Sequence, residues 1–152
     1  MHTATSSDKI EISSEKQTEE LAKRIQEKLK LGDIVFLYGE IGVGKTTFVK
    51  YLINFYQSKN NVKLSEVTSP TYNLLNEYSI NKIKINHYDL YRIKRVKELD
   101  ELNLFTDNSN IITLVEWPQI VKKKPKQLIE LNFEYDDDYK KRYVQTKGLI
   151  LN

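Results

Sequence analysis

The segment Gly39-Glu40-Ile41-Gly42-Val43-Gly44-Lys45-Thr46 has the spacing of a phosphate-binding loop, G-x-x-x-x-G-K-[ST]. Glycines let such a loop curl so that successive backbone N–H groups point inward at phosphate oxygens. Lys45 is then placed to meet the β- and γ-phosphates of a nucleotide, and Thr46 offers a hydroxyl to Mg²⁺. These residues predict a binding site for a nucleoside polyphosphate and its metal ion.

Phosphoryl chemistry also requires a carboxylate near the metal ion, and two acidic residues stand in suitable places. Glu116 follows the apolar run 111–115, and Asp89 follows the alternating run 84–88. Either side chain is suited to hold Mg²⁺, directly or through water. The residues by themselves leave open which one does so, and a solvated carboxylate at a strand end is the alternative for each.

Several polar residues near these acids have both a chemical and an ordinary interpretation. Thr71 lies in Ser-Pro-Thr, and a hydroxyl on a mobile loop can sense a γ-phosphate, although this tripeptide is also typical of a plain turn. His87 shares a strand face with Asp89, because the two are two residues apart. Arg92 and the basic segment 122–126 suit a phosphate or an acidic partner, and they suit a solvated surface equally well.

The elements that must position these groups follow from the apolar pattern. The run Ile34–Tyr38 is almost wholly apolar and predicts a buried strand before the glycine-rich turn, with a helix over 45–56 after it. An earlier helix begins at Ser14, which forms a capping box with Gln17, and it continues to a C-cap at Gly32. Further strands are predicted over 9–13, 72–80, 82–88, 111–115, 127–135 and 142–147, and a short helix over 95–104.

This order of elements predicts the fold class. Strand, helix, strand and helix, followed by several strands, indicate an α/β protein with the P-loop NTPase fold: a central mixed, largely parallel β-sheet flanked by helices. Residues 1–8 are small and polar, and we expect them to form a disordered tail. Residues 9–152 are expected to form a single domain, in keeping with the length of 152 residues.

Composition excludes several classes of protein. The absence of cysteine excludes a disulfide scaffold and a thiolate metal site, and two histidines are too few for a multi-histidine metal site. The 24 basic and 21 acidic residues nearly balance, so the net charge of +3 does not select nucleic acid as a partner. No apolar run approaches the ~18 residues of a membrane span, and the first ten residues lack a signal-peptide core. We therefore expect a cytoplasmic protein without a membrane partner.

Four segments in a fixed order carry a resemblance to a known family. The segments are GEIGVGKTT at 39–47, SPTYNLLNEY at 69–78, HYDLYR at 87–92 and VEWP at 115–118. Together they resemble the TsaE family, formerly called YjeE, of small bacterial P-loop ATPases required to form threonylcarbamoyladenosine at position 37 of tRNAs. The resemblance covers residues 9–150. Glu40, Ile41 and Val43 depart from the Asp, Leu and Ala usual in the family, but they keep similar size and chemistry.

The resemblance implies cofactors, partners and residue roles. It implies ATP with Mg²⁺, and hydrolysis that resets a TsaD–TsaB heterodimer between turnovers, so that tRNA is reached indirectly through the complex. By position, Thr46 and Glu116 are implied metal ligands, Asp89 the acid of a Walker-B-like element, and Thr71 part of a switch-like loop. Lys45 joins Asp89, Glu116 and Thr71 as an implied catalytic residue. The expected nucleotide contacts are Gly39, Gly42, Val43, Gly44, Lys45, Thr46, Thr47 and Trp117.

Two other functions compete with this interpretation. A small-molecule kinase shares the phosphate loop, but such kinases add an arginine-rich lid, and the dense basic segment after the loop is only 92–97. A nucleic-acid-binding module would use the basic loops, yet no stripe of interleaved aromatic and arginine residues is present.

Overall fold

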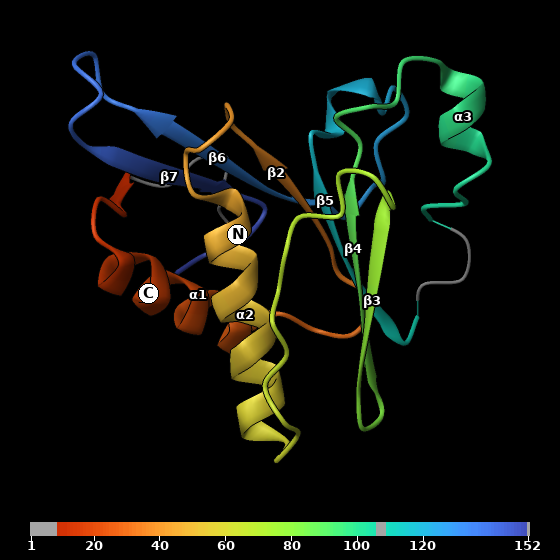
Figure 1. The fold of residues 1–152 in the computed structure, drawn as a ribbon, viewed down its shortest axis with the longest axis horizontal. Helices are drawn as coiled ribbons and strands as arrows, with labels where there is room; N and C mark the ends of the chain where they lie inside the picture. The colour runs from red at the N-terminus through yellow and green to blue at the C-terminus, as the bar shows by residue number, and fades with distance from the viewer. Residues whose placement is uncertain (1–8, 106–108, 152) are drawn as a thin grey trace.

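A single seven-stranded sheet forms the centre of the computed structural model, which describes residues 9–105 and 109–151 (Figure 1). The strand order is β1-β7-β6-β2-β5-β4-β3. The expected tail at 1–8 lies outside the described residues. The strands are β1 (Ile10–Glu11), β2 (Ile34–Tyr38), β3 (Leu75–Ile80), β4 (Ile83–Asp89), β5 (Ile111–Glu116), β6 (Ile129–Tyr135) and β7 (Arg142–Lys147).

The four central strands, β6, β2, β5 and β4, pair in parallel, and the outer strands β1, β7 and β3 pair antiparallel. This confirms the predicted mixed, largely parallel sheet. The interior of β2 is fully buried at Val35, Phe36 and Leu37, as expected for a strand with layers on both faces. Because β2, β4 and β5 run in the same direction, their carboxyl ends meet at one edge of the sheet, which is where open α/β sheets bind ligands.

Helices α1 (Glu15–Lys28) and α2 (Lys45–Lys59) pack together on one face of the sheet (Figure 1). Phe48 of α2 meets Phe133 of β6 edge-on, with ring centres 5.7 Å apart. The opposite face is covered by irregular segments together with the short helices α3 (Val96–Asp100) and η1 (Pro118–Ile120), and its core includes Phe36 and Val115. No helix within 9–105 or 109–151 is long and apolar enough to span a membrane.

The start of α1 agrees with the prediction and its end does not. Ser14 forms the expected capping box: its hydroxyl accepts from the Gln17 backbone at 3.2 Å, and its own N–H donates to the Gln17 side chain at 2.9 Å. The C-cap at Gly32 is wrong, because the helix ends at Lys28 and Leu29 is the cap. Leu29 turns into an extended conformation, and its partly buried side chain packs against the core.

Other element boundaries also differ from those predicted. Helix α2 runs to Lys59 instead of residue 56, and Gln57 in its last turn is held by two hydrogen bonds to Ser65. Strand β3 begins at Leu75 instead of 72, because the preceding residues turn and the Leu74 N–H donates to Pro70 at 2.7 Å. The helix predicted over 95–104 and the strands predicted over 9–13 and 127–135 are likewise shorter than expected.

The packing of α2 on the sheet generates a stability prediction. Leu52 is fully buried in the core beneath α2, so Leu52→Ala should lower the free energy of unfolding by about 2–5 kcal/mol through lost burial and a residual cavity. Lys23→Ala on the exposed side of α1 is the control and should change the free energy of unfolding by less than ~0.5 kcal/mol. Urea denaturation of the two variants measures the difference, and equal effects would contradict the assigned core.

Candidate functional site

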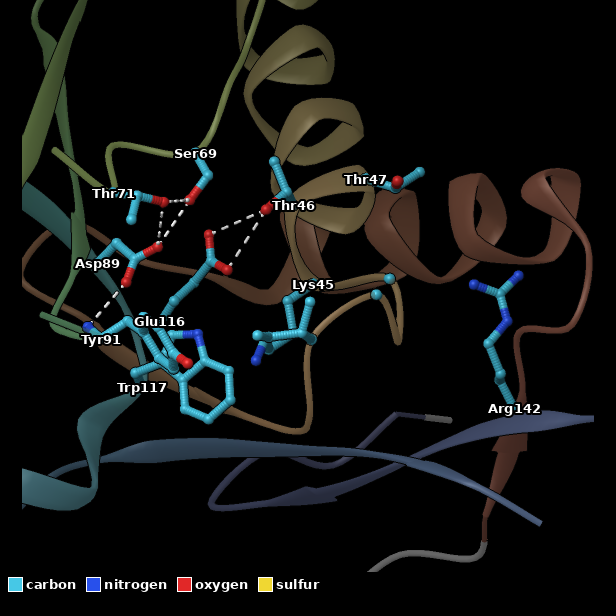
Figure 2. Close-up of a pocket in the computed structure, with 13 residues that line it drawn as sticks. Lys45, Thr46, Thr47, Ser69, Thr71, Asp89, Tyr91, Glu116, Trp117 and Arg142 are labelled. Carbon is cyan, nitrogen blue, oxygen red and sulfur yellow. Dashed lines mark hydrogen bonds between the residues drawn. The ribbon is translucent and has the colours of Figure 1, made fainter. Parts of the chain in front are cut away.

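A cavity of about 390 Å³ lies where the carboxyl ends of β4 and β5 face the glycine-rich turn and the first turn of α2 (Figure 2). Segments distant in the sequence meet there: the turn after β2, the ends of β4 and β5, and the start of β7. They are joined by the loop before β3 that carries the hydroxyl groups of Ser69 and Thr71, called the hydroxyl-bearing loop below. Its walls are formed by Ile41, Gly42, Gly44, Lys45, Thr46, Thr47, Ser69, Thr71, Asp89, Tyr91, Glu116, Trp117 and Arg142.

The turn after β2 is shaped by its close approach to β6. Gly39 has a φ of 145°, and a Cβ there would lie 2.8 Å from the Phe133 carbonyl oxygen, so no larger residue fits without a shift. The side chain of Val43 is fully buried and faces the core, while the Gly42 carbonyl accepts from the Tyr135 hydroxyl at 2.9 Å. The turn is therefore held by contacts with β6 and the core on one side, and its other side faces the cavity.

Lys45 places a buried positive charge on the cavity wall. The residue is only 5% exposed, and burial lowers the pKa of its ammonium group, while Glu116 and Asp89 act in the opposite direction. Its Nζ donates to the Gly39 carbonyl and lies 3.7 Å from the centre of the Trp117 ring. The ammonium group is thus held between the turn and an aromatic ring at the place where a phosphate charge would compensate it.

Thr46 and Glu116 meet at the base of the cavity (Figure 2). The Thr46 hydroxyl lies 3.4 Å from each carboxylate oxygen of Glu116, which is 2% exposed. His87 Nε2 lies 2.6 Å from Glu116 Oε2 and fixes the orientation of the carboxylate. His87 itself is fully buried, one strand over on β4.

This pair of oxygen donors suits Mg²⁺. A hydroxyl and one carboxylate are ligands that Mg²⁺ takes up in nucleotide sites, where phosphates and water complete its octahedron. Within 9–105 and 109–151 no group of three or more acidic or histidine side chains would hold a metal ion without such help. The donor set therefore fits a metal ion that arrives with a polyphosphate.

Asp89 joins the hydroxyl-bearing loop to the same site. It is the register partner of Glu116 on the neighbouring strand, so the two carboxylates lie side by side. Its Oδ2 accepts from Ser69 at 2.7 Å and from Thr71 at 3.3 Å, and its Oδ1 accepts from the Tyr91 backbone at 2.9 Å. The carboxylate is 3% exposed, and these contacts satisfy it.

Most of the residues expected at the site come together, and two of them do not line the cavity. Gly39 and Val43 do not line the cavity: the first supplies a carbonyl to Lys45 and the second packs inward. Arg92 does not line it either, since its Nη1 donates to the Tyr72 carbonyl at 3.3 Å on the exposed surface. The segment 122–126 is also absent from the walls.

The structure adds residues that the sequence did not single out for the site. Ser69 and Tyr91 lie inside the motifs SPTY and HYDLYR, so the motifs contained a signal for them. Ile41 extends from the glycine-rich turn with 70% of its surface exposed. No motif in the sequence pointed to Arg142, because only the pairing of β7 with β6 brings this distant residue to the cavity.

Comparison with known proteins identifies the family. The family model described as Threonylcarbamoyl adenosine biosynthesis protein TsaE matches residues 12–144. The chain is 40% identical over 131 residues to a tRNA threonylcarbamoyladenosine biosynthesis protein TsaE of Rickettsia bellii, covering 86% of this chain and 88% of that protein. It is 38% identical over 131 residues to the TsaE of Aquifex aeolicus, covering 86% and 90% of the two chains.

A solved structure supports the fold independently. Bacillus subtilis YdiB superposes with a TM-score of 0.70 at 22% identity, over 98% of this chain and 90% of that one. This likeness agrees with the predicted P-loop NTPase fold. The family match spans the glycine-rich turn, the hydroxyl-bearing loop and both strand-end carboxylates. The chain therefore belongs to the TsaE family of tRNA threonylcarbamoyladenosine biosynthesis proteins.

Proposed function

We propose that this protein binds ATP with Mg²⁺ in the cavity described above and hydrolyses it during threonylcarbamoyladenosine modification of tRNA. The observation that carries the proposal is the meeting of Lys45, Thr46, Glu116 and Asp89 around one cavity at the start of a helix. A helix N-terminus with a phosphate-binding loop favours anionic phosphate groups. An ATPase assay on the purified protein, with and without Mg²⁺, tests it.

Each residue has a role in the proposed reaction. Lys45 contacts the β- and γ-phosphates, and the backbone N–H groups of the turn hold the phosphate chain. Thr46 and Glu116 would hold Mg²⁺, which would supply positive charge to the phosphate oxygens. Asp89 orients the water that attacks the γ-phosphate, and through Ser69 and Thr71 it connects that position to the hydroxyl-bearing loop.

The proposed partners are the TsaD and TsaB proteins, with tRNA reached through their complex. P-loop enzymes that lack a full set of cations at the γ-phosphate hydrolyse slowly alone, and an added arginine raises the rate by ~10³ or more. The guanidinium group of Arg92 donates to the Tyr72 backbone carbonyl outside the cavity. Arg92 therefore does not supply a cation for the γ-phosphate in this structure. We therefore expect slow hydrolysis by the protein alone and stimulation by the partner proteins.

No observation favours the small-molecule kinase. The basic segment 92–97, the candidate for its arginine-rich lid, contributes no residue to the cavity wall. Arg95 in that segment is paired with Glu98 on the exposed surface.

Lys45→Ala should abolish productive ATP binding while the fold remains intact. The ammonium group is the positive charge that the first turn of α2 places on the cavity wall, and alanine cannot replace it. Lys50→Ala, on the exposed side of the same helix, is the matched control and should bind ATP normally. Nucleotide titration and circular dichroism measure the two properties, and unchanged affinity in Lys45→Ala would reject the site.

Glu116→Gln and Asp89→Asn should each reduce Mg²⁺-dependent hydrolysis by at least ~10-fold, since each removes a charge beside the reacting phosphate. Glu116→Gln should weaken Mg²⁺ affinity more, because Glu116 is the carboxylate that contacts Thr46. Hydrolysis rates measured across a Mg²⁺ titration separate the two effects. If only Asp89→Asn changes the metal dependence, the division of roles between the two carboxylates is reversed.

Thr71→Ala should reduce stimulation by TsaD–TsaB more than it reduces ATP binding. Its hydroxyl bonds to Asp89, so the loop transmits partner contact to the carboxylate instead of holding the nucleotide itself. Thr68→Ala is the control, because Thr68 is exposed and outside the cavity wall. Affinity and stimulated turnover are measured on the same preparations. Equal losses of the two in Thr71→Ala would count against a switching role.

A further inference from the structure

Arg142 at the start of β7 is a cavity residue without an assigned role. Its guanidinium group lies beside the glycine-rich turn, where Nη1 is 3.4 Å from the Val43 carbonyl and Nη2 is 3.0 Å from the Ser13 carbonyl. A Cβ on Gly44 would come within 3.2 Å of Nη1, so glycine at this position leaves the space that the guanidinium group occupies. The arginine is therefore held against the phosphate-binding turn itself.

The charge of Arg142 is not neutralised by a neighbouring acid. Among the ion pairs formed within 9–105 and 109–151, none joins Arg142 to a carboxylate. Its two contacts use carbonyl oxygens, and a guanidinium group has five N–H donors, so three donors remain. A permanent cation with free donors on a cavity wall is suited to a phosphate oxygen.

The position of Arg142 indicates which phosphate it meets. Lys45, Thr46 and Glu116 mark the end of the cavity that takes the β- and γ-phosphates and the metal ion. Figure 2 shows Thr47 and Arg142 on one side of Lys45, with the hydroxyl-bearing loop and Asp89 on the other. A nucleotide bound with its γ-phosphate beside Asp89 directs its α-phosphate toward Thr47 and Arg142.

We infer that Arg142 is a nucleotide-binding residue that contacts the α-phosphate of the bound nucleotide, at the end of the cavity opposite the reacting γ-phosphate. This inference rests on the proposed function, because it takes ATP as the ligand. Arg142 binds ATP and ADP alike, and it contributes to affinity instead of to the hydrolysis step. It also ties β7 to the turn, so the start of β7 becomes part of the nucleotide site.

The test compares Arg142→Met and Arg142→Lys with the wild-type protein, and uses Arg95→Met as a matched control that removes an exposed arginine outside the cavity. Calorimetric titration with Mg²⁺-ATP and Mg²⁺-ADP gives the affinities, and turnover is measured at saturating ATP. Arg142→Met should weaken the affinity for ATP and the affinity for ADP by the same factor of ~10 or more, on the scale of a lost charged hydrogen bond. The loss should appear as weaker binding at Mg²⁺-ATP concentrations below saturation, and Arg142→Lys should recover part of the affinity because it restores the charge.

Three results would overturn the inference. The first is an Arg142→Met variant with the same affinity as Arg95→Met, and the second is a loss of ATP affinity much larger than the loss of ADP affinity, which would place the arginine at the γ-phosphate. Equal weakening in Arg142→Met and Arg142→Lys would show that the arginine only braces the turn. If the wild-type protein binds no ATP, the proposed function itself fails, which is a separate outcome.

A measurement on the wild-type protein decides the matter if the variants do not fold. Phenylglyoxal modifies accessible arginines, and mass spectrometry reports the extent at each position. Mg²⁺-ADP should protect Arg142 and leave Arg95 as reactive as before. Equal modification of Arg142 with and without saturating Mg²⁺-ADP would overturn the inference.

Discussion

Two buried carboxylates, placed side by side by parallel strand pairing, are the constraint on which the rest of the site depends. Asp89 and Glu116 end neighbouring strands in exact register, and each is almost completely removed from solvent. Burying a charged group is costly unless hydrogen bonds and opposite charges compensate it. The surroundings supply that compensation through His87, Thr46 and Lys45, and through the hydroxyl groups of the loop before β3.

The need to satisfy these carboxylates explains why loops so far apart in the chain are held together. Ser69 and Thr71 donate hydrogen bonds from the hydroxyl-bearing loop to Asp89. Thr46, at the N-terminus of α2, donates to Glu116. The same contacts are the ones that a bound metal ion and a γ-phosphate would compete for. In the proposed function, this arrangement would couple an occupied site to the position of the hydroxyl-bearing loop.

The two ends of the cavity belong to different parts of the sheet. The end of the cavity that holds the two carboxylates is formed by β4 and β5, at the centre and one side of the sheet, and the opposite end is formed by β7 beyond β6. The glycine-rich turn lies between them, packs closely on Phe133 and accepts a hydrogen bond from Tyr135 of β6. The two carboxylates and Arg142 therefore lie on separate elements of the sheet.

The sequence by itself determined the fold class, the phosphate-binding turn, the capping box of α1 and the two strand-end carboxylates. Each of these rests on local spacing or on a short motif, and local spacing is visible in the chain. Helix ends were less predictable: Leu29 leaves α1 before Gly32 and packs against the core, and a side-chain contact to Ser65 accompanies the extra turn of α2.

Only the tertiary structure decided which distant side chains share the site. The pairing of Glu116 with His87 depends on the register between β4 and β5, and the placement of Arg142 depends on the antiparallel pairing of β7 with β6. Arg92, which lies inside a family motif, faces away, while Arg142, which lies in no motif, reaches the cavity. Strand register and the twist of the sheet set these neighbours, and neither is encoded in the spacing of nearby residues.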